Sequence, residues 1–249
     1  MTKLKIVRRE AANLAGLSML LYGQSKVGKT TVAASFSQPL IVACHPKGVD
    51  ALVGVDIVYV DTLASLKSIV PDIVASDYRT VVLDDITLLI NHEGRQGAGQ
   101  TGQNGQPVRG EAVYRDLVRK VDDALTQLFA TNKIIIATGH DRSVESTDST
   151  GSKTIEIRPD ANEVLSDYLV RTFSIVGYCH SALNGPQMTT RPTIKQVTVN
   201  REQVIYHILA GDRFNILPNP VALKPDVIRQ NLAKLLGNGS KPAQAEQEK

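Results

Sequence analysis

Short apolar runs rich in β-branched residues alternate with amphipathic stretches over the first 140 residues of the chain. Each run is nearly continuous in its apolar character, which is typical of strands that are buried on both faces of a parallel sheet. The predicted strands lie at residues 18–23, 39–44, 55–60, 80–85 and 133–140.

Between these runs, apolar positions recur every three or four residues, and this spacing predicts helices with one buried face. The predicted helices cover residues 29–37, 63–76, 111–132 and 162–173. Because strands and helices alternate, the pattern predicts an α/β core whose mostly parallel sheet is flanked by helices.

Two polar stretches interrupt the alternation. Residues 91–111 are rich in glycine and glutamine and predict a mobile loop, because they offer few apolar groups for packing. Residues 141–160 predict a hairpin that turns at 149–152. Both stretches follow the carboxyl end of a predicted strand or the helical turn after it, and this is the edge at which α/β proteins bind ligands.

The pattern changes after residue 173. The segments "FSIVGYCHS", "IKQVTVN" and "QVIYHILAGDRF", separated by turn-like residues, predict antiparallel strands that extend the sheet. We therefore expect an N-terminal segment 1–17, a large domain 18–217, a helix within 218–236 that starts at Pro225, and a disordered tail 237–249.

Composition adds little to this picture. The 249 residues are 42% hydrophobic and 21% charged, with a formal net charge of +3 and a pI near 8.8. This mild excess of positive charge tolerates a polyanionic partner without indicating one. Cys44 and Cys179 lie in apolar segments and predict buried free thiols, and no apolar run is long enough to span a membrane, so we expect a cytoplasmic protein.

The stretch "GQSKVGKT" matches the pattern G-x-x-x-x-G-K-[ST] between a predicted strand and a predicted helix, and this pattern predicts a phosphate-binding loop for ATP. Glycines let successive N–H groups point at one phosphate, a lysine reaches the β- and γ-phosphates, and a threonine hydroxyl binds Mg²⁺. The predicted nucleotide-binding residues are Gly23, Gln24, Ser25, Lys26, Val27, Gly28, Lys29, Thr30 and Thr31.

Two aspartates end the predicted strand 80–85. Asp84 ends an apolar run, where a carboxylate is costly unless it faces a cation or water, so we assign it with Thr30 to Mg²⁺. Asp85 either polarises the attacking water or caps the helix that follows it.

His140 and Arg213 follow two further apolar runs. His140 either senses the γ-phosphate and passes its presence to the next loop, or simply ends its strand. Arg213 is either an exposed turn residue beside Asp212 or an arginine finger that reaches the nucleotide of an adjacent subunit.

The set "GQSKVGKTT", "TVVLDD", "ATGH", "IEIRPD" and "AGDRFN" resembles phage-encoded RecA-like ATPases, the Sak-type single-strand annealing proteins of the AAA-family nucleotide-binding group. The resemblance implies a RecA-like ATPase domain, ATP and Mg²⁺ as cofactors, and homo-oligomers with nucleotide at the subunit interface. It also implies work on single-stranded DNA in the cytoplasm of a bacterial host, beside a single-strand-binding protein as a further partner. By the same resemblance, the two polar stretches face DNA and Arg213 acts across the interface.

The chain also departs from the RecA-like pattern. Those enzymes commonly carry a glutamate after the second core strand to activate water, whereas this chain has His45, Pro46 and Lys47 there. We therefore expect slow hydrolysis with Asp85 as the remaining candidate base. The polar stretches contain no aromatic residue for base stacking. Their basic residues either attract DNA phosphates or are incidental: Arg95, Arg109, Arg142 and Lys153.

Two other functions fit the same motifs. A small-molecule kinase would use the polar loop with its arginines as a lid over the phosphate donor, but it leaves the late strands without a role. A nucleotide-dependent switch or scaffold with negligible hydrolysis agrees with the missing glutamate.

Overall fold

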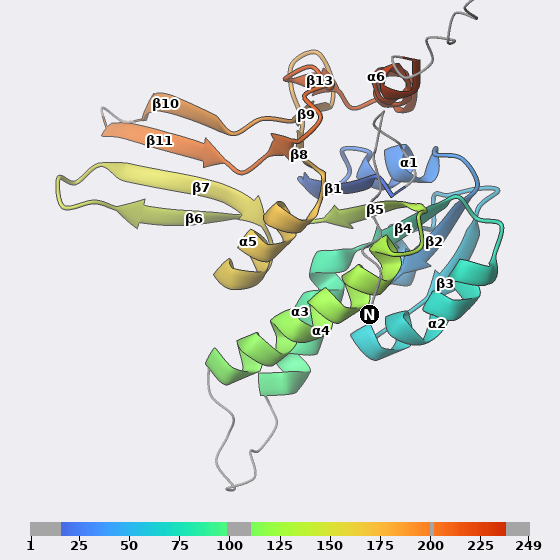
Figure 1. Ribbon diagram of the computed structural model, residues 1–249. Helices are drawn as coiled ribbons and strands as arrows, with labels where there is room; N and C mark the ends of the chain where they lie inside the picture. The colour runs from blue at the N-terminus through green and yellow to red at the C-terminus, as the bar shows by residue number, and fades with distance from the viewer. Residues whose placement is uncertain (1–15, 99–110, 200–201, 238–249) are drawn as a thin grey trace, which may run out of the picture.

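The core of the protein is one mixed sheet in the order β13-β9-β8-β1-β5-β4-β2-β3 (Figure 1). Strand β12 pairs with β8. The computed structural model describes residues 16–98, 111–199 and 202–237. The parallel strands are β1 (Ser18–Gly23), β2 (Pro39–Ala43), β3 (Asp56–Tyr59), β4 (Thr80–Asp84), β5 (Ile134–Gly139) and β8 (Ile175–His180). The antiparallel strands are β9 (Gln187–Thr189), β12 (Gly211–Asp212) and β13 (Val221–Ala222). The predicted fold class, an α/β core with a mostly parallel sheet and antiparallel strands added in the C-terminal third, is confirmed.

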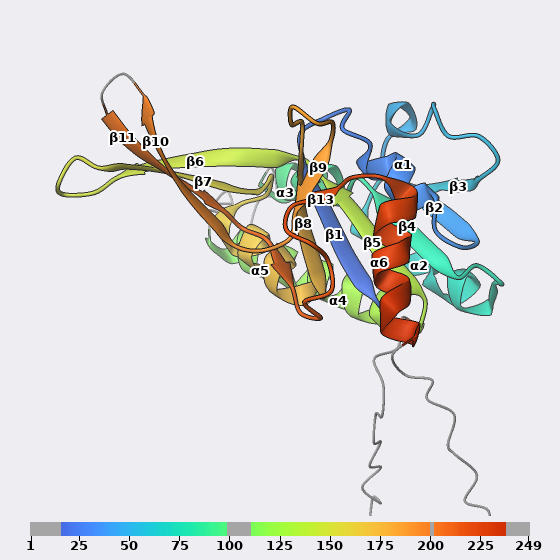
Figure 2. The ribbon, with the colours of Figure 1, turned by 90° about the horizontal axis from the view of Figure 1, so that it is seen from above.

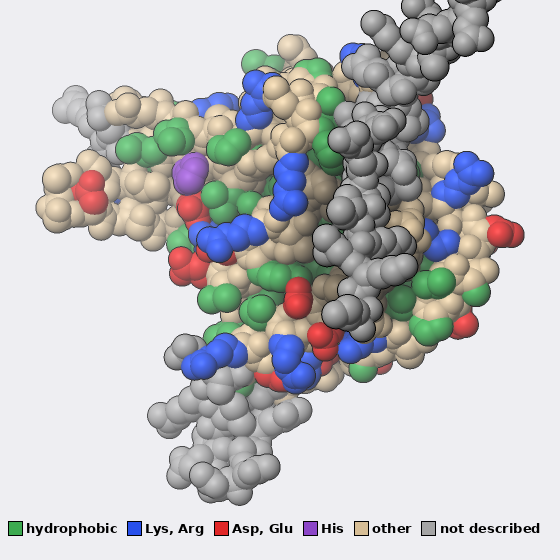
Figure 3. Space-filling view, in the orientation of Figure 1, with side chains coloured by type: hydrophobic (Ala, Val, Ile, Leu, Met, Phe, Trp, Pro, Cys, Tyr) green, Lys and Arg blue, Asp and Glu red, His purple; other side chains and the backbone are tan. Residues whose placement is uncertain are grey.

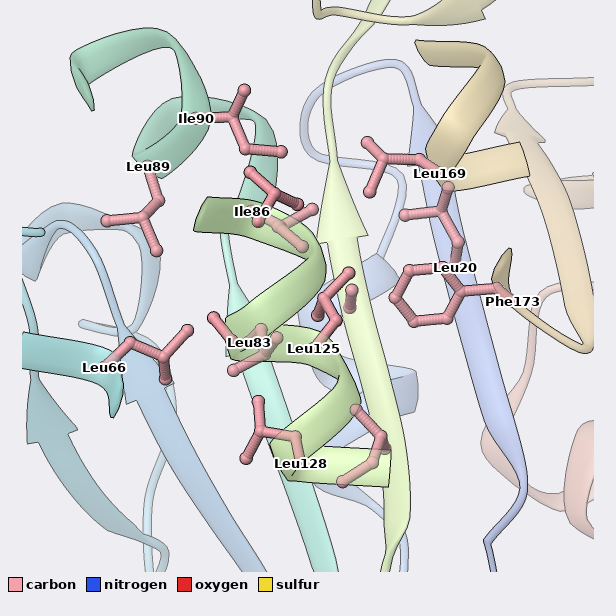
Figure 4. Close-up of a cluster of buried hydrophobic side chains, with 14 of the residues drawn as sticks. Leu20, Leu66, Leu83, Ile86, Leu89, Ile90, Leu125, Leu128, Leu169 and Phe173 are labelled. Atoms are coloured by element: carbon pink, nitrogen blue, oxygen red, sulfur yellow. The ribbon is translucent and has the colours of Figure 1, made fainter. Parts of the chain in front are cut away.

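Helices cover both faces of this sheet, which explains why its central strands read as continuous apolar runs. One face packs against α2 (Leu63–Ala75), α3 (Ile86–Ala98), α4 (Glu111–Phe129) and α5 (Glu163–Thr172). The other face packs against α1 (Lys29–Ala34) and α6 (Pro225–Gly237) (Figures 1 and 2). Along β1, Leu20 and Tyr22 enter the first of these cores and Met19 and Leu21 the second. Figure 4 shows the first core, with Leu20 beside Phe173 and Leu169.

The strand order determines which chain segments meet at the ligand edge. Strand β5 lies between β1 and β4, so Tyr22 pairs with Gly139 on one side of β5 and Leu83 with Ala137 on the other. All three strands run in the same direction. Their carboxyl ends therefore bring the segment after Gly23, the end of β4 and the end of β5 to one edge of the sheet.

A second sheet of four strands projects from this core (Figures 1 and 2). Its order is β10 (Thr193–Val199), β11 (Glu202–Ile208), β7 (Lys153–Pro159) and β6 (Asp141–Thr147), and β11 runs parallel to β7. The predicted hairpin is confirmed as β6–β7. In its turn, the Asp148 carboxylate accepts hydrogen bonds from the N–H groups of Thr150 and Ser152.

Two details of the late strands were predicted wrongly. Strand β8, within "FSIVGYCHS", is parallel to β1 and lies inside the core, as befits a run that is buried along most of its length. Strands β10 and β11 do not extend the main sheet but pair with β6–β7. Alternation of apolar and polar residues indicates a half-buried strand but does not identify its partner.

The loop predicted from Asn91 begins later than expected, because α3 continues to Ala98. Tertiary contacts support the extra turns: Glu93 forms an ion pair with Lys120 of α4, and the Asn91 amide donates to the Asp160 carbonyl. A Cβ atom on Gly94 would lie 3.2 Å from Leu117, so glycine lets α3 and α4 pack closely. Residues 99–110 of this loop, residues 1–15 of the N-terminal segment and residues 238–249 of the tail lie outside the described residues. Within the described part of the chain, no helix is long and apolar enough to cross a membrane.

Candidate functional site

The loop between β1 and α1 has the backbone of a phosphate-binding loop. Gly23 has a φ of 137°, and a Cβ atom there would lie 2.1 Å from the Cys179 carbonyl oxygen of β8. Gly28, which precedes α1, has a φ of 99°. Both positions require glycine, because side chains with a Cβ rarely adopt these angles.

The side chain of Lys29 is held inside this loop. Its ammonium donates to the carbonyl oxygens of Gly23 at 2.9 Å and Gln24 at 2.7 Å, and the residue is only 7% exposed. Burial lowers the pKa of Lys29, and nearby acidic groups oppose this effect. The ammonium therefore lies beside the position that a phosphate takes in such a loop, on a flexible four-carbon stem that lets it leave its two carbonyl acceptors.

Asp84 joins the loop to the neighbouring strands. Its Oδ1 atom accepts hydrogen bonds from the hydroxyls of Thr30, at 2.9 Å, and Thr138. Its Oδ2 atom would lie 3.0 Å from a Cβ atom on Gly48, so the segment after β2 closely approaches this carboxylate. No group of three or more His, Cys, Asp or Glu side chains that could hold a metal occurs among the described residues. One carboxylate with one hydroxyl suits Mg²⁺, which takes its other ligands from phosphates and water.

Asp85 caps α3. Its Oδ1 atom accepts hydrogen bonds from the N–H of Thr87 at 2.7 Å, the hydroxyl of Thr87 at 2.6 Å and the N–H of Leu88 at 3.2 Å. Burial raises the pKa of Asp85, and the Thr87 hydrogen bond acts in the opposite direction. Of the two predicted roles, the capping geometry is therefore present, while action on water remains a prediction.

His140 connects three elements. Its backbone N–H donates to the Thr87 hydroxyl at 3.0 Å. Its ring Nδ1 lies 3.3 Å from the Ser25 hydroxyl oxygen, and its ring Nε2 lies 3.5 Å from Asp85 Oδ2. The histidine thus contacts the phosphate-binding loop and the start of α3, and the next residue begins β6. Its role as a γ-phosphate sensor remains a prediction.

These groups surround one cavity of about 470 Å³, a volume suited to a small-molecule ligand. Of the predicted nucleotide-binding residues, the cavity is lined by Ser25, Lys26, Gly28, Lys29, Thr30 and Thr31. The other three act differently. Gly23 and Gln24 supply the carbonyl groups that hold Lys29, and Val27 is packed in the core.

Sequence reasoning missed part of the cavity wall. Gly48 and Ala51, after β2, and Leu88 in α3 line it with His45. The segment after β2 was interpreted only as lacking the glutamate that RecA-like enzymes carry there. The glycine in "PKGVD" was the available signal that backbone closely approaches another group there.

Arg213 lies far from the cavity of its own chain. Strand β12 pairs with the first residues of β8, and Ile175 of β8 pairs with Met19, near the amino end of β1. From Met19 to Gly23, where the cavity edge begins, is about 13 Å of strand. The Arg213 guanidinium donates to the Arg171 carbonyl, while the Asp212 carboxylate accepts hydrogen bonds from the N–H groups of Phe214, Ile216 and Leu217. Action on an adjacent subunit remains a prediction.

The basic residues predicted to face DNA are dispersed. Arg95, in the last turn of α3, lines a second cavity of about 260 Å³ beside the first. Arg142 and Lys153 lie at opposite ends of the hairpin β6–β7, and Arg109 lies outside the described residues. On the face shown in Figure 3, basic and acidic side chains lie interspersed.

Among the comparisons with known proteins, the match to a family model agrees with a nucleotide site. A family model described as "AAA domain" matches residues 15–202. Among solved structures, the KaiC-like protein PH0186 from the hyperthermophilic archaeon Pyrococcus horikoshii OT3 is similar, at 14% sequence identity and a TM-score of 0.42. That match covers 77% of this chain and 90% of the other. No curated protein matches the chain.

Proposed function

Because the chain belongs to the AAA domain family, we propose that it is an ATP-binding, Mg²⁺-dependent ATPase that acts on single-stranded DNA in phage-type recombination or annealing. One observation carries the proposal: the groups suited to a nucleoside triphosphate surround a single cavity, and the wall of that cavity continues into the hairpin β6–β7. The nucleotide state then controls how the hairpin meets DNA.

ATP binding relies on the loop between β1 and α1. The backbone N–H groups of residues 25–30 suit the β-phosphate, whereas the Gln24 N–H donates to the Cys179 carbonyl. The Lys29 ammonium exchanges its two carbonyl acceptors for β- and γ-phosphate oxygens. Thr30 and Asp84 would hold Mg²⁺, which, when bound, neutralises charge on the reacting phosphates. Thr138 keeps the Asp84 carboxylate in place through its hydroxyl.

The link to DNA runs through His140. A γ-phosphate beside Ser25 competes for the contacts of the His140 ring, and any shift of that ring acts directly on Asp141, the first residue of β6. The hairpin carries Arg142 and Lys153, which attract phosphates of a single strand.

Arg213 favours an oligomeric form of this ATPase. It is exposed and lies toward the end of β1 opposite to its own cavity, so any nucleotide that it contacts belongs to an adjacent copy. We therefore include a homo-oligomer with nucleotide between subunits in the proposal.

The proposed ATPase is tested by steady-state hydrolysis with matched variants. Lys29→Ala is expected to lower turnover by about 100-fold or more, because it removes a cation from the charge-stabilising set. Asp84→Asn should impair the Mg²⁺-dependent step. Lys224→Ala, an exposed lysine before α6, is the control and should retain wild-type activity. Wild-type activity in both site variants would contradict the site assignment.

The DNA role is tested separately by fluorescence anisotropy of labelled single-stranded DNA with ATP, with ADP and without nucleotide. ATP-dependent binding supports the proposal, whether or not DNA stimulates hydrolysis. If the protein does not change the anisotropy of the labelled DNA in any nucleotide state, the DNA role is excluded. Transfer of phosphate to an added metabolite would then favour the kinase, and ATP-dependent assembly without turnover would favour the switch.

A further inference from the structure

Three side chains from different elements form a line at the cavity wall. The Ser25 hydroxyl oxygen lies 3.3 Å from His140 Nδ1, and His140 Nε2 lies 3.5 Å from Asp85 Oδ2. All three residues line the cavity of about 470 Å³. A nucleophile or water, a histidine and an orienting carboxylate in this order are the arrangement that proteins use to remove a proton.

We propose that His140 is the catalytic base that takes the proton from the water attacking the γ-phosphate, and that Asp85 is a positioning residue for its imidazole. This inference rests on the proposed ATPase function. The catalytic role that the sequence suggested for Asp85 is thereby assigned to His140. His140 takes the place of the glutamate that is missing after β2.

The hydrogen bonds of Asp85 argue against Asp85 itself as the base. Its Oδ1 atom already accepts three hydrogen bonds, two from Thr87 and one from Leu88, and the residue is 8% exposed. Its Oδ2 atom faces the His140 ring. Both oxygens are thus directed at protein groups. Water reaches the His140 side chain, which is 38% exposed, more readily than the Asp85 side chain, which is 10% exposed.

The other carboxylate of the site is also engaged. Asp84 and Asp85 are the carboxylates among the described residues that line the cavity. Asp84 Oδ1 accepts from the Thr30 and Thr138 hydroxyls, and Asp84 is assigned to the ion. This leaves a histidine as the group able to accept a proton.

The surroundings of His140 select the useful form of its ring. With the Asp85 carboxylate at Nε2, the proton of a neutral imidazole belongs on Nε2, and Nδ1 presents a lone pair toward Ser25 and the cavity. The backbone of His140 is fixed as well, because its N–H donates to the Thr87 hydroxyl, which in turn donates to Asp85 Oδ1. A contact of 3.5 Å is long for a hydrogen bond, and such contacts shorten when substrate closes the site.

The chemical step balances with these groups. The oxygen of water forms a bond to the γ-phosphorus, the bond from that phosphorus to the β–γ bridging oxygen breaks, and its electron pair stays on ADP. The water proton passes to His140 Nδ1, while the Nε2 proton stays shared with Asp85. His140 later returns the proton to phosphate or solvent.

The matched test is His140→Gln, which keeps hydrogen-bonding groups near the cavity but cannot take a proton. The turnover number should fall by about 100-fold or more, while the affinity for a fluorescent ATP analogue stays at the wild-type value. In His140→Ala, added imidazole should restore part of the turnover. His92→Gln, on the exposed side of α3, is the control and should behave as wild type.

Asp85 is tested by the same measurements. Asp85→Asn keeps a cap for α3, so its melting temperature should stay near wild type while its turnover number falls. Adding Asp85→Asn to His140→Gln should cause no further loss, since both residues serve one step. A purely structural role would instead give additive losses.

Several outcomes would overturn the inference. Wild-type turnover in His140→Gln with a lost response to DNA would identify a sensor and not a base. A loss in His45→Gln that exceeds the loss in His140→Gln would move the base to the segment after β2. ATP binding without any hydrolysis by the wild type would remove the base but leave the DNA test of the proposed function intact, whereas absence of ATP binding would remove the proposed function itself.

Discussion

Replacing Tyr22 by phenylalanine removes a single oxygen atom from the interior and tests how the second sheet is attached to the phosphate-binding strand. Tyr22 is fully buried and immediately precedes Gly23. Its hydroxyl donates to the Leu209 carbonyl and lies 3.2 Å from the Ile157 carbonyl, and both of these residues lie where the second sheet joins the core.

The expected loss of stability depends on which carbonyl groups lose a hydrogen-bond donor in Tyr22→Phe. The Ile157 carbonyl keeps the hydrogen bond from the Leu209 N–H at 3.1 Å, whereas the Leu209 carbonyl loses the tyrosine donor. The phenyl ring preserves the packing, so the change removes one hydrogen bond and exposes one carbonyl to an apolar interior. We expect the free energy of unfolding to fall by about 2 kcal/mol. For a chain of this size, that loss lowers the melting temperature by about 4–8 °C.

The assay is thermal or urea unfolding of Tyr22→Phe beside Tyr168→Phe. The Tyr168 hydroxyl donates to Asp122 at 2.7 Å at the surface, so the same chemical change there should cost less than about 0.5 kcal/mol. A loss in Tyr22→Phe no larger than the loss in Tyr168→Phe would refute the reasoning.

The pH dependence gives a second check on Tyr22. Burial raises the pKa of Tyr22 well above its ordinary value. As the pH passes about 10, the unfolded chain releases this proton before the folded protein does, so the free energy of unfolding falls. The stabilising difference is complete below pH 10 and is lost above it. In Tyr22→Phe, the decline above pH 10 should be smaller than in wild type.

The remaining predictions concern the backbone and the thiols. Gly23→Ala should prevent stable folding, because its Cβ atom would lie 2.1 Å from the Cys179 carbonyl oxygen. Gly211→Ala is the control and should fold normally, because nothing lies within 4 Å of the new atom. Circular dichroism and thermal unfolding compare the two variants. Burial raises the pKa of Cys44 and Cys179 to about 12. At pH 8, both thiols should therefore react with a disulfide reagent roughly a thousandfold more slowly in the folded than in the unfolded protein, and fast reaction without denaturant would contradict this burial.

The core and the phosphate-binding loop were predictable from the sequence, because both depend on local information. A continuous apolar run indicates a strand covered on both faces, and glycines at 23 and 28 indicate a backbone that other residues cannot adopt. Lys29, Thr30 and Asp84 could then be placed together, since carboxyl ends of parallel strands share an edge of the sheet.

Pairing between distant segments was not predictable in the same way. The strand in 173–181 is as apolar as the core strands, but its direction depends on the connection through α5. The last turns of α3 contain Gly94 and depend on contacts with Leu117 and Lys120 that are far away in the sequence. The contact of Asp85 with His140 likewise becomes visible only when β4 and β5 are placed beside each other, whereas its capping contact with Thr87 is local in the sequence.

Two connections join the cavity to the second sheet, and both offer a route for the proposed control of DNA binding. His140 leads directly into β6, and Tyr22, which precedes the phosphate-binding loop, holds Leu209 at the end of β11. A connection transmits a nucleotide signal only if its two ends prefer different arrangements with and without the γ-phosphate. Measuring DNA affinity with ATP and with ADP for Tyr22→Phe, His140→Gln and the double variant separates the two routes. If the ratio of DNA affinity with ATP to DNA affinity with ADP is the same in the wild type and all variants, neither connection carries the signal. If the two single substitutions change this ratio non-additively in the double variant, both connections act on one movement of the hairpin.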